Sequence, residues 1–375
     1  MILETYLNEN RFFELNQIEL NKIINENTYY LTEGFTDTIE SIGNKIWEGI
    51  KKIFEKIKNA IKWIKEKTVD KIINFFKSKI HKKKAEAEAN KVIKTVEQSI
   101  KDTIDEDNNT NDSTDDNMYD NTDDNNEIPS AQNTSSTNTS AAENIKKTTV
   151  VKVLDIHNKF DFNRIKKLDS KISDFTDLFE DKIYNYITIF SNNKEPEDTE
   201  FKTENLIKIF DNKKVEVIND LFKIEEYDED ITVDDSIEIS ELRLKYKNIF
   251  DNKLKNIYVE LNYETFEKGK DRYIKDIEDG INQYIESLTK ISGQLKMTSR
   301  EYDKSEKKAK EMLKFIKDNI KGYSNEVVDK FKSNLIRLYA EVAKCTNQIF
   351  AILNNKLIVE SETLYKIPYF KIEER

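Results

Sequence analysis

Residue types that carry acid, base and nucleophilic chemistry are sparse in this sequence. Histidine occurs only at His81 and His157, in separate segments, and the single cysteine is Cys345. A triad needs a histidine beside its nucleophile, and a histidine-based metal site needs several of them at defined spacing. Cys345 lies in an apolar helical stretch, where a buried and unreactive thiol is the more common outcome. These residues therefore predict no catalytic centre.

Carboxylates are abundant but do not form a recognisable site. The cluster Asp228-Glu229-Asp230 with Asp234-Asp235 lacks the alternating oxygen ligands and central glycine of a calcium loop, so it predicts a solvated acidic loop. No phosphate-binding loop or dinucleotide fingerprint is present. We expect a protein that is not an enzyme and binds no cofactor or metal. A scattered carboxylate site in the C-terminal part is the remaining enzymatic alternative.

The most regular chemical pattern is a basic, aromatic-rich amphipathic helix predicted over residues 42–80. Apolar side chains recur every three or four residues, and both tryptophans of the chain lie in this stretch. We assign to its membrane or partner face Ile46, Trp47, Ile50, Phe54, Ile57, Ile61, Trp63 and Ile64. Lysines lie largely on the opposite side, and the proposed basic face comprises Lys51, Lys52, Lys58, Lys62 and Lys65.

Three partners would fit this helix. Its apolar face could pack on the C-terminal part of the chain or on a second copy, which would make a homo-oligomer. Lysines opposite tryptophan and phenylalanine are also typical of helices that lie on an anionic membrane surface. Lysines further neutralise phosphates, but without arginine or a base-stacking sheet such DNA binding would be nonspecific. The sequence leaves these alternatives open.

Charge divides the chain into four segments. Residues 1–33 form a leader with a net charge of −4, in which helical spacing predicts a short helix over 4–30. Residues 34–101 form a basic helical region, of which 34–84 carry +8. Residues 102–145 contain twelve acidic residues and no lysine or arginine, and we expect a disordered acidic linker there. Residues 146–375 form the predicted C-terminal domain. Such segregation usually accompanies separate roles. The linker fits a plain flexible spacer, and the alternative is that its charge masks the basic helix.

The expected fold class is mainly α: an N-terminal amphipathic helix, the linker, and a C-terminal helical bundle with a small two-stranded β element. Only seven glycines and three prolines occur in 375 residues, which favours long helices with few breaks. Beyond the linker, helical periodicity predicts helices near 165–191, 203–224, 238–260, 263–296, 299–321 and 325–356. Gly322 and Ser324 predict a C-cap followed by an N-cap, and 148–154 and 356–370 are the candidate strands.

The tetrapeptide Leu31-Thr32-Glu33-Gly34 resembles the processing site of prohead proteases in large contractile-tailed phages. Those proteases cleave after Glu in a Leu/Ile-x-Glu pattern. An acidic leader, this motif and a Lys/Ile/Trp-rich helix, in that order, resemble the beginning of phage internal-head proteins. Other tripeptides also fit, among them 2–4, 64–66, 239–241 and 358–360. The last, Ile358-Val359-Glu360, is expected in an exposed tail.

The resemblance implies a virion protein of the prohead core, made in the host cytoplasm and packed inside the capsid. It would be trimmed after Glu33 and ejected with the DNA, its partners being other head proteins and the prohead protease. The alternative is a membrane-active, toxin-like effector acting through the helix at 42–80.

The helical period of the C-terminal part does not keep a strict heptad, so a bundle is favoured there over a coiled-coil rod.

Overall fold

The computed structural model describes residues 11–23, 39–109, 135–159, 168–192, 194–222, 239–319 and 323–374. Helices dominate these residues, and a three-stranded antiparallel sheet accompanies them. The predicted mainly-α fold class is therefore confirmed. The sheet contains one strand more than the sequence predicted.

The chain forms two compact units, and each unit draws on distant parts of the sequence. Unit 1 comprises residues 1–75, 161–252 and 284–364, whereas unit 2 comprises 76–160, 253–283 and 365–375. This division differs from the linear one expected from charge, because most of the basic helix at 42–80 shares a unit with much of the C-terminal part. Composition reflects solvation along the chain and does not indicate which segments pack together.

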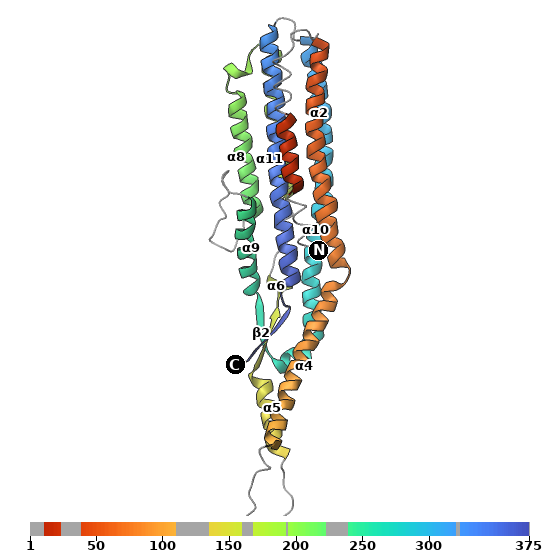
Figure 1. The fold of residues 1–375 in the computed structure, drawn as a ribbon, viewed down its shortest axis with the longest axis vertical. Coiled ribbons are helices and arrows are strands. Elements are labelled where there is room, and N and C mark those ends of the chain that lie inside the picture. The colour runs from red at the N-terminus through yellow and green to blue at the C-terminus, as the bar shows by residue number, and fades with distance from the viewer. Residues whose placement is uncertain are drawn as a thin grey trace, which may run out of the picture. The chain divides into compact units, whose positions relative to one another are not determined.

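Unit 1 is all helical in the described residues (Figure 1). A helix over 11–23 is followed by α2 Ile39–Trp63, a π-helical segment η1 Ile64–Val69 and the first part of α3 Asp70–Lys77. The remaining elements are α7 Leu168–Ser191, the 3₁₀ turn η3 Pro196–Asp198, α8 Thr203–Phe222, α9 Ile239–Lys255, α10 Tyr263–Asn319 and α11 Asn325–Lys366, of which α9, α10 and α11 also extend into unit 2.

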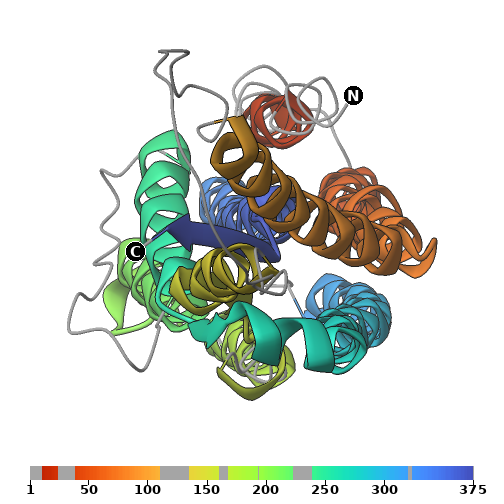
Figure 2. The same cartoon turned by 90° about the horizontal axis from the view of Figure 1, so that it is seen from below.

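Helix α11 provides the centre of unit 1. Between Leu335 and Leu364 its side chains are buried on nearly all sides, and a helix that is covered all round lies inside its bundle. Seen end-on in Figure 2, the blue helix α11 lies among the other helices of the unit. The core is therefore built around one apolar helix.

Two helices are longer than the sequence predicted. The stretches 263–296 and 299–321, expected as separate helices, form the single helix α10, since Met297 and Thr298 do not interrupt the helical backbone. Helix α11 continues to Lys366, so the strand predicted over 356–370 is wrong for most of its length. Its apolar residues fit a buried helix as well as a strand, and only packing distinguishes the two.

The predicted N-cap of α11 is confirmed. The backbone N–H of Val327 donates to the Ser324 hydroxyl oxygen at 3.3 Å, which satisfies one of the free donors at the helix start. Gly322, the predicted C-cap, lies outside the described residues.

The helix predicted over 42–80 is interrupted once and ends slightly early. It runs through α2, the π-helical η1 and α3, and it stops at Lys77. Lys79 follows in the left-handed region with φ 61°, and α4 Ile80–Asn109 begins immediately afterwards. The π-helical turn places Thr68 and Val69 in the core of unit 1, where both are buried.

Unit 2 joins helices to the small sheet. It contains α4, α5 Ser135–Thr148, α6 Ile156–Lys159 and the beginning of α10. Its strands are β1 Thr149–Leu154, β2 Tyr258–Asn262 and β3 Phe370–Glu374, in the order β2-β1-β3. The strand predicted at 148–154 is confirmed as β1. The strand β2 was missed, because its residues were assigned to the end of a helix.

The central strand pairs antiparallel with both neighbours. Val151 lies opposite Leu261 on one side and Ile372 on the other. Lys152, on the opposite face of β1, forms ion pairs with Glu260 and Glu373 at 3.3 and 2.8 Å. Cross-strand charge pairs of this kind help to select the register.

Part of the predicted acidic linker is helical. Residues 102–109 belong to α4 and residues 135–145 belong to α5, and these two helices pack against each other. Each helix is thereby stabilised by packing that its polar composition alone does not reveal. Residues 110–134 lie outside the described residues.

Buried tyrosines make the stability of unit 1 sensitive to high pH. Tyr302 and Tyr284 are fully covered, and burial raises the pKa of Tyr302 to about 12 and that of Tyr284 well above its usual value of 10.0. Burial also raises the pKa of Tyr339. The folded state thus holds these phenols protonated at pH values where the unfolded chain ionises them.

We expect the free energy of unfolding to fall as the pH rises from about 10 towards 12. The raised phenol pKa values stabilise the folded state fully only below the pKa that these phenols have in the unfolded chain, and this contribution is lost above it. Each such tyrosine lowers the free energy of unfolding by about 1.4 kcal/mol per pH unit in this window. Circular dichroism and absorbance at 295 nm, recorded together, check this. Ionisation of all tyrosines well before helix loss would contradict it.

Candidate functional site

The apolar face predicted on the basic helix lies in the core of unit 1. Ile46, Ile50, Phe54, Ile57, Ile61 and Ile64 are all at most 6% exposed, whereas Trp47 and Trp63 are half-buried. The structure therefore brings the predicted face together, and it faces protein. Of the three interpretations, packing on the chain's own body is the one observed.

Aromatic contacts identify the partners of this face. The Phe54 ring meets Tyr339 of α11 and Tyr302 of α10 edge-on, with ring centroids 5.7 and 6.4 Å apart. At the outer edge of the face, the ammonium of Lys310 lies 5.6 Å from the centroid of the Trp47 ring. Phe54 is thus fixed between the two longest helices of the unit.

The basic face remains at the surface, but part of its charge is paired. Lys58 forms ion pairs with Asp303 and Glu306 of α10 at 3.2 and 2.6 Å, and Lys65 pairs with Asp70 at 2.8 Å. Lys51 is half-buried, and Lys52 and Lys62 are exposed. The ion pairs of Lys58 and Lys65 reduce the positive charge available to an outside anion.

The helix predicted in the leader is present over 11–23, and its packing on α11 adds an element to this site. The helix over 11–23 places Asn16 against Asn347 of α11, and the Asn16 amide nitrogen donates to the Asn347 side-chain oxygen at 2.8 Å. The Asn347 amide nitrogen donates in turn to the Phe13 carbonyl oxygen at 3.1 Å. Asn16 and Asn347 are 6% and 4% exposed, so this network is buried. Buried amides with satisfied partners fix the position and register of the helices that carry them.

Aromatic and ionic contacts also join the leader helix to the basic helix. Phe12 stacks on Trp63 at 4.9 Å with the rings 7° from parallel, and Phe13 meets Trp63 edge-on at 5.5 Å. Glu19 forms an ion pair with Lys56. We call the surface of α2 and α11 that receives the leader helix the leader groove. Lys56, Trp63 and Asn347 form it. The leader is thus part of the folded unit, which its charge pattern did not predict.

The proposed cleavage motif itself, Leu31-Thr32-Glu33-Gly34, lies outside the described residues. The competing matches at 64–66, 239–241 and 358–360 all lie in helices. Ile358, Val359 and Glu360 were expected in an exposed tail, and this is wrong, because they are buried in α11. A helical segment must unfold before a protease can bind it as an extended strand.

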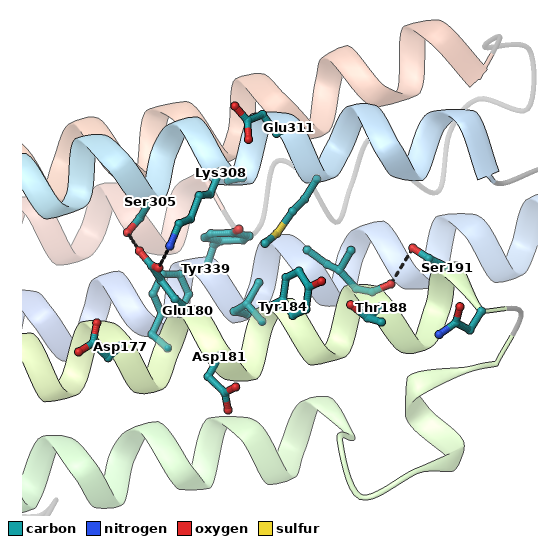
Figure 3. Close-up of a pocket in the computed structure, with 16 residues that line it drawn as sticks. Asp177, Glu180, Asp181, Tyr184, Thr188, Ser191, Ser305, Lys308, Glu311 and Tyr339 are labelled. Carbon is teal, nitrogen blue, oxygen red and sulfur yellow. Dashed lines mark hydrogen bonds and ion pairs between the residues drawn. The ribbon is translucent and has the colours of Figure 1, made fainter.

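A separate groove of about 730 Å³ lies on unit 1 between α7 and α10, with Tyr339 of α11 contributing to its wall (Figure 3). Ile183, Ile187 and Met312 give it an apolar lining, and Tyr184 at its rim is 53% exposed. Sequence periodicity did not predict it, because its lining comes from helices that lie far apart in the sequence.

One end of this groove is polar. Glu180 accepts hydrogen bonds from the Ser305 hydroxyl and from the Lys308 ammonium, the latter at 2.5 Å, and the hydrogen bond to Glu180 raises the pKa of Lys308 (Figure 3). These groups therefore satisfy one another. The described lining contains no histidine or cysteine, so the groove can receive apolar groups but has no activated nucleophile among these residues.

The residues with catalytic potential are not among those that form either feature. Cys345 is buried in α11, as predicted, and burial raises the pKa of its thiol, which disfavours the reactive thiolate. In unit 2, the Nδ1 atom of His81 lies 2.9 Å from the Phe76 carbonyl oxygen, and that of His157 lies 3.0 Å from the amide nitrogen of Gln283. Both histidines therefore make structural hydrogen bonds.

The described part of the chain holds no cluster of three or more metal-ligating side chains. Among the same residues, no helix is both long and apolar enough to cross a bilayer. The acidic cluster at 228–235 lies outside them.

No family model, curated protein or solved structure matches this chain.

We expect Phe54→Ala to lower the free energy of unfolding by about 3–5 kcal/mol, because it opens a cavity between α2, α10 and α11. Lys52→Ala, on the exposed side of the same helix, is the matched control and should stay within about 0.5 kcal/mol of the parent. Urea denaturation followed by circular dichroism measures both. Equal small effects would show that α2 does not pack through this face in solution.

Proposed function

We propose that this chain is a non-enzymatic virion protein packed inside the head of a large contractile-tailed phage, trimmed after Glu33 during capsid maturation and ejected with the DNA. Its partners would be other head proteins and the prohead protease that processes it. The observation that carries the proposal is Leu31-Thr32-Glu33-Gly34, placed where an acidic leader meets a basic helix.

The folded body supports the choice of Glu33 over three of the competing sites. Ile64 and Glu360 are buried within helices, and Glu241 lies in the first turn of α9. Cleavage at the two buried sites would require local unfolding of unit 1, which costs free energy because buried side chains must first be exposed to water. A body that resists cutting at these positions suits a protein that must survive in a compartment with an active protease.

The buried packing of α2 supports a structural role for the basic helix. Its apolar face contributes to the core, and its lysines at the surface include Lys52 and Lys62. A face of this kind could make nonspecific contacts with packaged DNA or with acidic head proteins. Such contacts would weaken steeply with salt.

Mass spectrometry of purified virions tests the processing claim. The mature protein is expected to begin at Gly34, with peptides of residues 1–33 absent from it or present only as a separate fragment. Immature heads from a protease-deficient phage are the control, and these should carry the intact chain. The processing claim would be contradicted if the protein in mature virions still carried residues 1–33.

The alternative, a membrane-active effector, would require α2 to leave unit 1 and expose Phe54 and its neighbours. We therefore expect the folded chain to remain in the soluble fraction when mixed with neutral or anionic vesicles at about 0.15 M salt. Liposome flotation measures this, with a free peptide of residues 42–80 as the positive control for vesicle binding. Recovery of the folded chain with anionic vesicles alone would favour the membrane interpretation.

A further inference from the structure

We propose that the leader groove is a helix-binding site, that the leader helix at 11–23 is its occupant in the uncut chain, and that cleavage after Glu33 turns this occupant into a dissociable ligand. The inference deepens the proposed function and rests on it for the cleavage event. Its chemistry is hydrolysis: one water is consumed, the Glu33–Gly34 peptide bond breaks, and a carboxylate and an amine are formed.

The side chains of the leader helix show what the groove recognises. Phe13, Asn16, Leu20 and Ile23 recur at three- or four-residue intervals and are each at most 8% exposed. Leu15 and Ile18, on the other side of the same helix, are 49% and 61% exposed. The buried stripe therefore reflects the groove and not a general tendency of this segment to be covered. This is the recognition of an amphipathic helix by a groove, with spaced apolar anchors.

The buried amide pair gives the groove specificity. Asn347 on α11 accepts a hydrogen bond from the Asn16 amide and donates one to the Phe13 carbonyl oxygen, and its amide nitrogen also lies 3.4 Å from the side-chain oxygen of Gln17. A helix without an amide at position 16 would leave the buried Asn347 side-chain oxygen without this donor. The groove thus favours a helix carrying an asparagine between its aromatic and aliphatic anchors.

Covalent attachment is what keeps a short helix in such a site. A tethered helix experiences an effective concentration on the order of mM, so cutting the chain at about 1 μM protein lowers it by roughly 1000-fold. Departure would uncover Asn347 and the ring of Trp63, which Phe12 covers by stacking. Processing would thereby open a surface on α2 and α11 that the precursor keeps filled.

Trp63 provides a local probe in the full-length protein. In a Trp47→Phe chain it is the sole tryptophan, and a flexible recognition linker for a site-specific protease can be inserted between Glu33 and Gly34. After cutting and dilution to about 1 μM, we expect residues 1–33 to elute separately and Trp63 emission to shift to the red. An excess of a synthetic peptide of residues 1–33 should reverse the shift. A leader that stays bound on dilution, or leaves without changing Trp63, would overturn the proposal.

Two peptide variants distinguish the groove from nonspecific rebinding. Leu20→Ala removes a buried anchor, whereas Ile18→Ala removes a similar apolar side chain that is exposed. The Leu20→Ala peptide should reverse the shift only at a concentration at least roughly tenfold higher than the parent peptide requires. The Ile18→Ala peptide should act at the same concentration as the parent. Equal potency of the two variants would refute the assigned site.

The same pair of substitutions in the uncut chain gives an independent measurement. Leu20→Ala should increase the quenching of Trp63 by acrylamide, and Ile18→Ala should leave it unchanged; identical quenching would also count against the groove. None of these assays uses the phage protease. The helix-binding proposal can therefore be refuted while virions still show cleavage at Glu33. Equally, the cleavage claim can be refuted while the helix-binding proposal stands.

Discussion

The fold of unit 1 depends on the burial of α11. Because this helix is covered on nearly every side, each neighbouring helix must contribute an apolar face to it. Helix α2 does so through Phe54, which contacts Tyr339, and α7 does so through Phe179, whose ring lies 5.3 Å from that of Tyr339. The amphipathic character of α2 is explained by this requirement, without any need for a lipid surface.

Polar side chains on α11 add specificity to this packing, because a buried polar group needs a partner. Neighbouring elements supply such partners: Asn16 of the leader helix donates to Asn347, Thr68 of η1 donates to Asn354 at 2.5 Å, and Tyr302 of α10 pairs with Thr346 at 3.0 Å. Tyr246 of α9 donates to the buried carboxylate Glu360, which also accepts from Lys356. Apolar burial alone would tolerate sliding of these helices, whereas matched polar pairs select one register.

This constraint also shapes the functional proposal. A leader that is hydrogen-bonded to the central helix differs from a loose extension, because its removal alters the surface of the folded body. Trimming would remove a segment of net charge −4 and uncover part of α2 and α11. The proposed maturation step would thus change what the protein can bind as well as its length. The groove between α7 and α10 lies elsewhere on unit 1, and its polar end at Glu180 is internally satisfied.

The sequence by itself determined features that depend on local order along the chain. Helical periodicity located α2, α7, α8 and α11, the Ser324 cap followed from a hydroxyl just before an apolar run, and Cys345 was expected to be buried. Periodicity can also define the apolar face of α2, since spacing alone places those residues on one side. These features arise from interactions over a few residues, which a single sequence records.

Only the tertiary structure decided what each face meets. The spacing of Ile46 to Ile64 is the same whether the helix packs on protein, lipid or a second copy, and the contacts with α10 and α11 made the choice. Strand β2 forms because β1 offers it a hydrogen-bonding edge, and the leader is anchored by Asn347, which lies 331 positions after Asn16. Partners so distant in sequence leave no periodic signal, so charge and spacing could not reveal them.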